Sequence, residues 1–216
     1  MIDINPNNQN QQTIKENILL SGIGLHSGKQ VNMKLIPAEV DQGVKFIRSD
    51  QKNNNEIDAI WSNVSETVLS TTISNKSKLK ISTIEHLMSA LSGLHIDNLT
   101  IYINASEVPI MDGSSRPFVD LIENAGIKVQ NKNRKLLNIK KTIEVKNDSS
   151  SVKIIPNNQF SIDFEIDFPS HLVSRQSCQL QLINGNYKSD IAAARTFGFE
   201  KDVEHLRSNE IGRAHV

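Results

Sequence analysis

The chain has 216 residues, in which 24 Lys and Arg balance 24 Asp and Glu, and hydrophobic residues make up 38% of it. That hydrophobic fraction indicates a folded core rather than a disordered chain, and the length allows one large domain or two small ones. Balanced charge provides no broad basic surface, which argues against nucleic acid or an anionic membrane as a partner. Cys178 is the single cysteine and cannot form an internal disulfide, which fits a reducing compartment.

The N-terminal residues 1–12 are rich in Asn and Gln and lack the basic and apolar regions of a secretory signal. We expect them to form a disordered tail. No apolar stretch in the sequence approaches the roughly 20 residues that a transmembrane helix requires. The sequence therefore predicts a soluble, cytoplasmic protein without a transmembrane segment, and we expect a monomer.

The first part of the chain alternates predicted strands with two helices. Alternating apolar and polar residues predict strands at residues 18–20, 31–36, 43–48, 71–73 and 98–103. One helix is predicted over residues 83–94, and a second has Pro117 in its first turn and ends at Gly126. The polar residues 130–135 have no apolar period, so we interpret them as a linker between a first domain at 13–130 and a second at 136–210.

The second part of the chain is predicted to be rich in strands. Strands are expected at residues 136–145 and 152–155, with a turn at Asn147 and Asp148 between them. Residues 160–168 alternate most regularly, with aromatic and aliphatic side chains on one face and acidic or hydroxyl side chains on the other. Strand-rich units with grouped helices predict an α+β fold.

The helix predicted at residues 83–94 has two distinct faces. A core stripe consists of Ile84, Leu87, Met88, Leu91 and Leu94. The opposite side carries Glu85, His86, Ser89 and Gly93 and has no Lys or Arg, so we expect something to pack or bind there. Because Ser82 and Glu85 have the spacing of a capping box, spacing alone favours a capping role for Glu85. His86 is a candidate metal ligand without a visible partner.

Six segments carry a resemblance to a known enzyme family. In chain order they are GIGLHSG (22–28), STIEHLMSAL (82–91), GLHIDN (93–98), EVPIMDGS (107–114), IDFEIDF (162–168) and ARTFGF (194–199). The second contains the pattern Thr-Ile-Glu-His-Leu. In this order, the segments make the chain similar to zinc-dependent UDP-3-O-acyl-N-acetylglucosamine deacetylases.

The resemblance implies roles for Glu85 and His86. In that family the His of this signature binds a catalytic Zn²⁺ and the adjacent Glu is the general base, so His86 takes the first role and Glu85 the second. Zinc lowers the pKa of bound water toward about 7, and a neighbouring carboxylate removes a proton as the water attacks an amide carbonyl. The implied reaction removes the N-acetyl group from the sugar and releases acetate.

The resemblance also implies contacts near the reacting amide. It places His26 beside the substrate, the Thr196 hydroxyl near the scissile carbonyl, and Phe197 and Gly198 along the same pocket. From the residues alone, we interpret the loop around His26 as a connection between strands that needs glycine for a positive φ. Thr196 reads as a turn residue or as the cap of a helix from about residue 200.

Further contacts are implied for the rim and for the uridine end of the substrate. Leu69 belongs to a segment, residues 67–71, that matches the active-site rim. Asp167 and Phe168 match an Asp-Phe pair that contacts the uridine, where an aromatic ring can stack on a base. Without the resemblance, the pair reads as an exposed acid beside a buried aromatic residue.

The remaining acidic and histidine residues favour structural interpretations. Glu107 and Asp112 could be mistaken for a glycosidase pair, but we interpret both as turn-forming residues with a helix-terminus effect. The other histidines match no catalytic motif, so we interpret them as structural: His95, His171 and His205.

The chain departs from the family pattern at its C-terminal end. The family takes its other zinc ligands from a downstream His-Lys-x-x-Asp helix and a general acid from a later His, so we expect these residues beyond the C-terminus. A catalytic zinc needs three protein ligands, and we expect this chain to bind zinc weakly and to be inactive alone. We interpret residues 211–216 as a foreign tail and exclude His215 from the metal site.

Taken as a whole, the resemblance implies two domains, each a sheet covered by helices, with the active site between them. The second domain is expected to be incomplete and to expose apolar surface. The implied substrate is a UDP-linked acylated amino sugar of lipid A biosynthesis. The alternatives are a noncatalytic module of the same fold that binds UDP-sugars or acyl chains, and an amidohydrolase that acts on a different N-acyl sugar.

Overall fold

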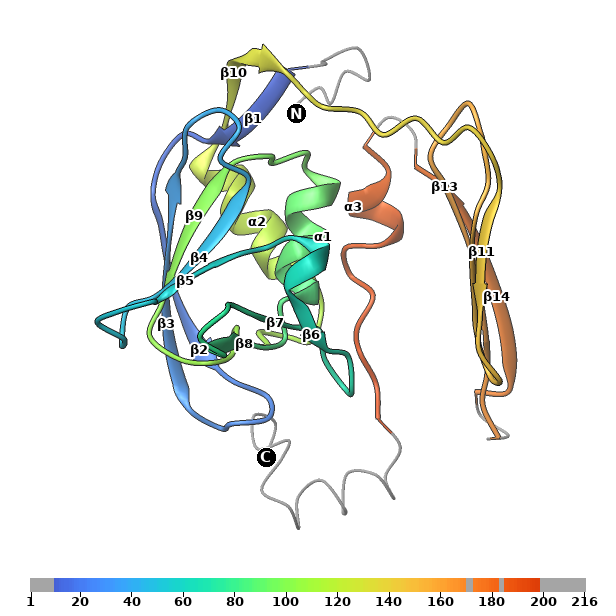
Figure 1. Ribbon diagram of the computed structural model, residues 1–216, viewed down its shortest axis with the longest axis horizontal. Helices are drawn as coiled ribbons and strands as arrows, with labels where there is room; N and C mark the ends of the chain where they lie inside the picture. Colours follow the sequence, from blue (N-terminus) through green and yellow to red (C-terminus); the bar gives the residue numbers. More distant parts are fainter. Residues whose placement is uncertain (1–9, 170–172, 183–184, 199–216) are drawn as a thin grey trace.

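The computed structural model describes residues 10–169, 173–182 and 185–198 (Figure 1). Its largest sheet has five strands in the order β2 (Ile18–Ile23), β3 (Gln30–Pro37), β9 (Leu99–Ile103), β4 (Val44–Arg48) and β5 (Glu56–Asp58). Neighbours are antiparallel except β4 and β9, which are parallel. The mixture of sheets and helices confirms the predicted α+β class.

Two helices cover one face of this sheet, α1 (Glu85–Gly93) and α2 (Arg116–Ala125) (Figure 1). On β3, Val31, Met33 and Leu35 are buried while the residues between them are exposed. Burying one face of a strand leaves the other for solvent. The result is a two-layer unit with its core between the sheet and the helices.

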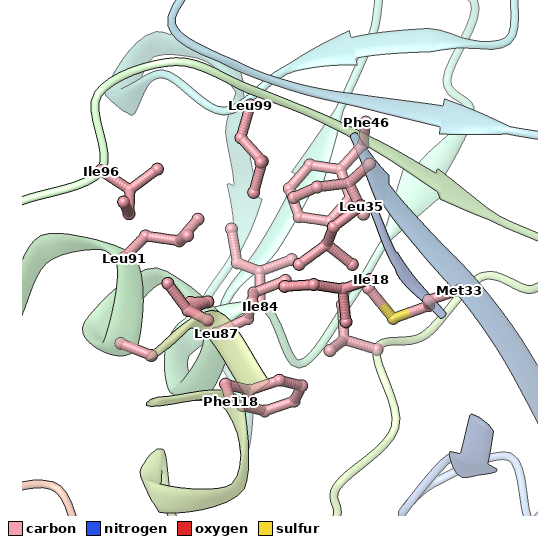
Figure 2. Packing of buried hydrophobic residues seen from close by; sticks show 14 of the residues in the cluster. Ile18, Met33, Leu35, Phe46, Ile84, Leu87, Leu91, Ile96, Leu99 and Phe118 are labelled. Atoms are coloured by element: carbon pink, nitrogen blue, oxygen red, sulfur yellow. The ribbon is translucent and has the colours of Figure 1, made fainter. Parts of the chain in front are cut away.

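The predicted core stripe of α1 is confirmed. Figure 2 shows Leu87 and Leu91 of α1 on the side of the core that faces Leu35 and Phe46 of the sheet. Ile84 and Leu94 are also buried, and Met88 packs partly buried at the edge of the cluster. This packing fixes the rotation of α1, so the opposite side of the helix points away from the sheet.

A small three-stranded sheet precedes α1 along the chain. It consists of β6 (Val64–Glu66), β7 (Thr72–Ser74) and β8 (Lys80–Ile81), and a short 3-10 helix at Trp61–Asn63 leads into it. The connection between β6 and β7 contains residues 67–71, the predicted rim segment. The sheet therefore carries this segment to the start of α1.

Two polar segments form strands where the sequence predicted none. β1 (Asn10–Ile14) pairs antiparallel with β10 (Ile127–Asn133), so the interpretation of residues 10–12 as disordered tail and of 130–133 as linker is wrong. The Asn98 amide donates to the side-chain oxygens of Gln11 and Gln130, both at 2.8 Å. Buried amide hydrogen bonds stabilise this pairing, and a search for apolar periodicity cannot detect them.

The later strands form two hairpins, β11 (Ile143–Lys146) with β12 (Ser151–Ile154) and β13 (Ser161–Asp167) with β14 (Arg175–Gln181). The predicted turn is present, because the Asn147 side chain accepts from the Ser149 and Ser150 N–H groups at 3.0 and 2.7 Å. The strand predicted over 136–145 forms only near its end. Large apolar side chains of these hairpins are exposed, as expected: Ile143, Val145, Val152, Phe160 and Phe164.

A third helix, α3 (Tyr187–Asp190), follows the hairpins and lies beside α1 (Figure 1). The sequence analysis did not predict it. Across the described residues, the structure has no helix with the length and apolar character needed to span a bilayer.

Candidate active site

Glu85 begins α1, but it does not cap the helix. Its carboxylate accepts a hydrogen bond from the Thr71 N–H at 3.0 Å, while Ile84 at the N-cap makes no side-chain cap bond. Ser82 instead donates its hydroxyl to the Ser106 carbonyl and forms a β-bridge with Glu107. The capping-box interpretation is therefore wrong, because the strand-like pairing of Ser82 holds it out of the N-cap position. Half-buried Glu85 faces the rim segment.

His86 lies half-buried on the side of α1 that points away from the sheet. Its imidazole makes no hydrogen bond or ion pair with any described residue, so it is available to a ligand. Within the described ranges, no group of three or more His, Cys, Asp or Glu side chains is placed to hold a metal ion. A catalytic zinc takes three protein ligands, so this part of the chain does not by itself form a zinc site.

The loop between β2 and β3 holds His26. The predicted need for a positive φ is met by Gly28 at 62°, which favours glycine. The His26 Nε2 atom is buried and has no hydrogen-bond partner among the residues that the structure describes. Buried polar atoms are nearly always paired, so an unpaired ring nitrogen at this position is available to a group outside the described residues.

Glu107 was predicted to form a turn, and the structure corrects that interpretation. The side chain is buried, and its carboxylate accepts from the His26 and Ser27 N–H groups, both at 2.9 Å. It also accepts from the Thr83 hydroxyl at 3.1 Å. Sequence reasoning missed this role because the partners are remote in the chain, although Glu107 lies inside one of the six recognised segments.

Asp112 does form the predicted turn. Its carboxylate accepts from the Ser114 N–H at 3.0 Å and from the Ser114 hydroxyl at 2.7 Å. Arg195 lies 3.4 Å away and forms an ion pair with it. These contacts attach the start of the Arg-Thr-Phe-Gly segment to the loop that enters α2.

Thr196 is fixed to the same loop through its backbone. Its N–H donates to the Gly113 carbonyl at 2.9 Å, and its methyl carbon is 3.6 Å from where a Cβ on Gly113 would lie. The side chain is exposed, so its hydroxyl can reach a ligand. The helix that Thr196 might have capped, from about residue 200, falls outside the described residues.

Tyr187 of α3 joins this segment to α1. Its hydroxyl is 2.7 Å from the hydroxyl oxygens of both Ser89 on α1 and Ser115 before α2. Its ring packs directly over Gly93, and the Ser115 hydroxyl donates to the Ala192 carbonyl at 3.1 Å. The part of this side of α1 formed by Ser89 and Gly93 is therefore packed against α3, in agreement with the predicted packing partner, although Tyr187 was not identifiable from the sequence.

The other predicted substrate contacts lie at the edges of the site. Phe168 and Phe197 contact each other edge to face, with ring centroids 5.7 Å apart and planes at 73°. This contact joins the end of β13 to the Thr196 segment. Asp167, Leu69 and Gly198 are all exposed.

Three bulky residues near these groups have backbone conformations that favour glycine. They are Leu69, Thr83 and Met111, with φ values of 61°, 57° and 56°. A positive φ costs a β-branched or bulky residue about 1–3 kcal/mol, and such strain clusters at active sites and ligand-binding segments. These residues lie in the rim segment, before Glu85 and beside Asp112, so the strain marks the same region of the molecule.

The structure therefore brings together most of the predicted residues, but in two linked groups. In the first group, Glu107 bonds to the His26 N–H and to Thr83, which lies two residues before Glu85. In the second group, Phe197 follows Thr196 and contacts Phe168. Among the described residues, no hydrogen bond or ion pair links Thr196 with Glu85 or His86. The connection between the groups passes through Tyr187 and through residues 107–113.

The chain is similar to known proteins over most of its length. Residues 11–215 match the family model for UDP-3-O-acyl N-acetylglycosamine deacetylase (LpxC). The chain belongs to this deacetylase family. The match includes most of residues 211–216, so it gives no support to a foreign origin for them, and that origin stays a prediction.

Relatives named UDP-3-O-acyl-N-acetylglucosamine deacetylase are similar over most of this chain. The protein of Syntrophus aciditrophicus is 41% identical over 92% of the chain and 62% of its own length. Those of Shewanella pealeana and Thioalkalivibrio sulfidiphilus are 42% and 43% identical over 93% of the chain and 66% of their own lengths. The chain thus spans less than two thirds of these deacetylases.

The packing of Tyr187 on α1 predicts the effect of Gly93→Ala in this member of the deacetylase family. Alanine is intrinsically the better helix former by about 1 kcal/mol, but its Cβ would lie 2.2 Å from a Tyr187 ring carbon. We therefore expect Gly93→Ala to lower the free energy of unfolding by about 1–3 kcal/mol in urea titration. Ser92→Ala, at the neighbouring exposed position, is the control, and equal stability of the two variants would contradict the packing.

The contacts of Asp112 predict a pH dependence. Burial acts to raise the pKa of its carboxyl, but the bonds from Ser114 and the charge of Arg195 outweigh it and hold the pKa below its usual 3.8. A carboxyl group whose pKa is lower in the folded state stabilises the protein at pH values above its unfolded-state pKa. This stabilisation is lost as the pH falls through the folded-state pKa. We expect wild type to be more stable than Asp112→Asn at neutral pH, with the difference shrinking in acid below pH 3.8. A difference independent of pH in chemical denaturation would contradict the assignment.

Proposed function

We propose that this chain provides the general base and much of the substrate site of a zinc-dependent deacetylase. The enzyme would hydrolyse the N-acetyl group of a UDP-3-O-acyl-N-acetylglucosamine and release acetate, in the cytoplasm, as a step of lipid A biosynthesis. The observation that carries the proposal is the position of Glu85. Its carboxylate starts α1 beside His86 and bonds to the rim segment, instead of closing a helix cap.

The proposed chemistry uses two groups of this chain. The Glu85 carboxylate accepts a proton from the attacking water, which then adds to the carbonyl carbon of the acetamide. The Thr196 hydroxyl donates a hydrogen bond to the oxygen that becomes negative. The Thr196 backbone N–H donates to the Gly113 carbonyl, and its exposed hydroxyl makes no hydrogen bond to a described residue.

Zinc is the metal that the family resemblance implies, and His86 is the one ligand we assign to it. A single imidazole does not fit the three-ligand requirement, so the described residues alone do not form the zinc site. We propose that the further ligands come from residues beyond the C-terminus of this chain. The 216-residue chain by itself is then expected to bind zinc weakly and to turn over no substrate.

The remaining predicted residues are proposed to hold the two ends of the substrate. The buried His26 Nε2 atom bonds to no described residue and is suited to a hydrogen bond with a sugar or carbonyl oxygen. The Phe168 ring offers aromatic surface for the uracil base, with the exposed Asp167 carboxylate beside it as an acceptor. Phe197, whose ring contacts Phe168, and Gly198 are proposed to line the pocket at the reacting amide. Leu69 lies exposed in the rim segment.

A noncatalytic module that binds UDP-sugars or acyl chains remains the alternative. The absence of a three-ligand cluster among the described residues favours it. The two proposals can be separated by measuring acetate release. The protein for this measurement is the chain extended to the full length of its relatives, called the completed version below. A binding module would retain affinity for the substrate and release no acetate.

Substitution of Glu85 tests the general base. Glutamine keeps an oxygen that can accept the Thr71 N–H but cannot accept a proton from water, so Glu85→Gln should fold normally. In the completed version we expect kcat to fall about 10² to 10⁴-fold, the usual contribution of a general base. Acetate release is the measurement, and Glu39→Gln, at an exposed position, is the control. Full activity in Glu85→Gln would remove the proposed mechanism.

Substitution of Thr196 tests the oxyanion contact. Thr196→Val keeps the side-chain shape and the backbone bond to Gly113 but removes the hydroxyl. We expect kcat to fall about 10² to 10³-fold with little change in KM, because the lost bond strengthens only in the transition state. Thr196→Ser restores a hydroxyl and should recover most of the rate. If the valine variant matches wild type in kcat, Thr196 has no such role.

A further inference from the structure

We propose that Glu107 is a positioning residue of this active site. Its buried carboxylate would hold the His26 loop and the start of α1 in one relative placement, so that His26 and Glu85 meet the same substrate. The inference rests on the proposed function for its consequence in catalysis. The contacts themselves do not depend on that function.

Both oxygens of Glu107 are occupied by groups of the protein. Oε1 accepts from the His26 N–H at 2.9 Å and from the Thr83 hydroxyl at 3.1 Å, and Oε2 accepts from the Ser27 N–H at 2.9 Å. The residue is only 2% exposed. A carboxylate with both oxygens engaged and no access to solvent is unsuited to proton transfer, which makes positioning the better assignment.

The backbone around Glu107 fixes the carboxylate to the start of α1. Ser82 donates its N–H to the Ser106 carbonyl at 2.9 Å, and Val108 donates to the Ser82 carbonyl at 3.0 Å. Ser82 is three residues before Glu85. Ile110 N–H donates to the Ile23 carbonyl at 3.1 Å, which ties the same segment to the end of β2.

The close approach at Gly24 shows how tightly the loop is held. A Cβ at this position would lie 2.5 Å from Glu107 Oε2 and 2.4 Å from the Ser27 hydroxyl oxygen. Real Cβ atoms do not approach oxygen so closely, so any other residue here would displace the Glu107 carboxylate or the Ser27 hydroxyl. The same loop carries His26, whose buried Nε2 atom bonds to no residue in the described ranges.

No Lys or Arg in the described part of the chain forms an ion pair with Glu107, so hydrogen bonds alone offset the cost of burying it. Burying a carboxylate is expensive unless its oxygens are fully bonded. An ordinary core position would be filled more favourably by an apolar side chain. The arrangement is explained if the carboxylate serves to fix the loop and the strained Thr83, whose φ is 57°, at the entrance to α1.

The first test measures the loop directly in the 216-residue chain. In Glu107→Gln, one of the two oxygens becomes an NH₂ group, which cannot accept from an N–H. We expect the His26 or Ser27 N–H to exchange with solvent about tenfold faster or more in hydrogen-exchange NMR, while N–H groups of β3 and β9 are unchanged. Glu107→Asp, which keeps a carboxylate on a shorter side chain, is the second variant in case the first does not fold. Unchanged exchange at His26 and Ser27 in a folded variant would overturn the proposal.

The second test measures catalysis in the completed version, with Asn98→Ala as the matched control. Asn98 is also buried and bonded through its side chain, but to β1 and β10 rather than to the site. We expect Glu107→Gln to lower kcat/KM about tenfold to a hundredfold, mainly through KM. We expect Asn98→Ala to lower stability with little change in KM, and Glu107→Asp to recover part of the lost kcat/KM.

The outcomes separate this inference from the proposed function. If Glu107→Gln loosens the loop but changes kcat and KM no more than Asn98→Ala does, the carboxylate is structural and the inference is overturned. If Glu85→Gln is as active as wild type, the proposed function fails, and the exchange measurement still decides whether Glu107 holds the loop.

Discussion

Residues 107–113 form one short segment on which the geometry of the whole site depends. The Glu107 carboxylate bonds to the His26 loop, the Val108 N–H bonds to Ser82 before α1, and the Gly113 carbonyl accepts from Thr196. Three parts of the chain that are remote in sequence are thus fixed to a single backbone. Because α1 is also fixed by its apolar stripe against the sheet, the face that carries His86 has one orientation. The site is positioned by hydrogen bonds to a rigid segment rather than by contacts among the predicted catalytic residues.

The features that were predictable from the sequence are those encoded by local patterns. The apolar period of residues 83–94 predicted α1 and its buried stripe, and the lack of long charged side chains around Ser89 and Gly93 predicted a packing partner. The resemblance added site roles for Glu85, His86, Thr196 and Phe168, which stay predictions. Asp112 formed its turn because an Asp before Gly bonds to the backbone two residues on, a local effect.

The features that were not predictable depend on partners remote in the chain. The β1 and β10 strands are polar and are joined by buried amide bonds of Asn98, which no hydrophobic period reveals. Glu107 had the same appearance as Asp112 in the sequence, but its carboxylate finds its donors at His26 and Ser27, about 80 residues earlier. The capping box predicted from the spacing of Ser82 and Glu85 does not form for a similar reason, because Ser82 forms a β-bridge with Glu107 instead. Local rules fail here because tertiary hydrogen bonds replace the local ones.

Residues 107–113 hold the Thr196 segment through Gly113 and the start of α1 through Val108 and Ser82. An NMR measurement on the isotopically labelled 216-residue chain can detect the contact with Thr196. The Thr196 methyl carbon lies 3.6 Å from the position of a Cβ on Gly113, so a strong nuclear Overhauser effect is expected between the Thr196 methyl protons and a Gly113 Hα. Absence of that effect, with random-coil shifts for residues 191–198, would show that Thr196 is not held at this site.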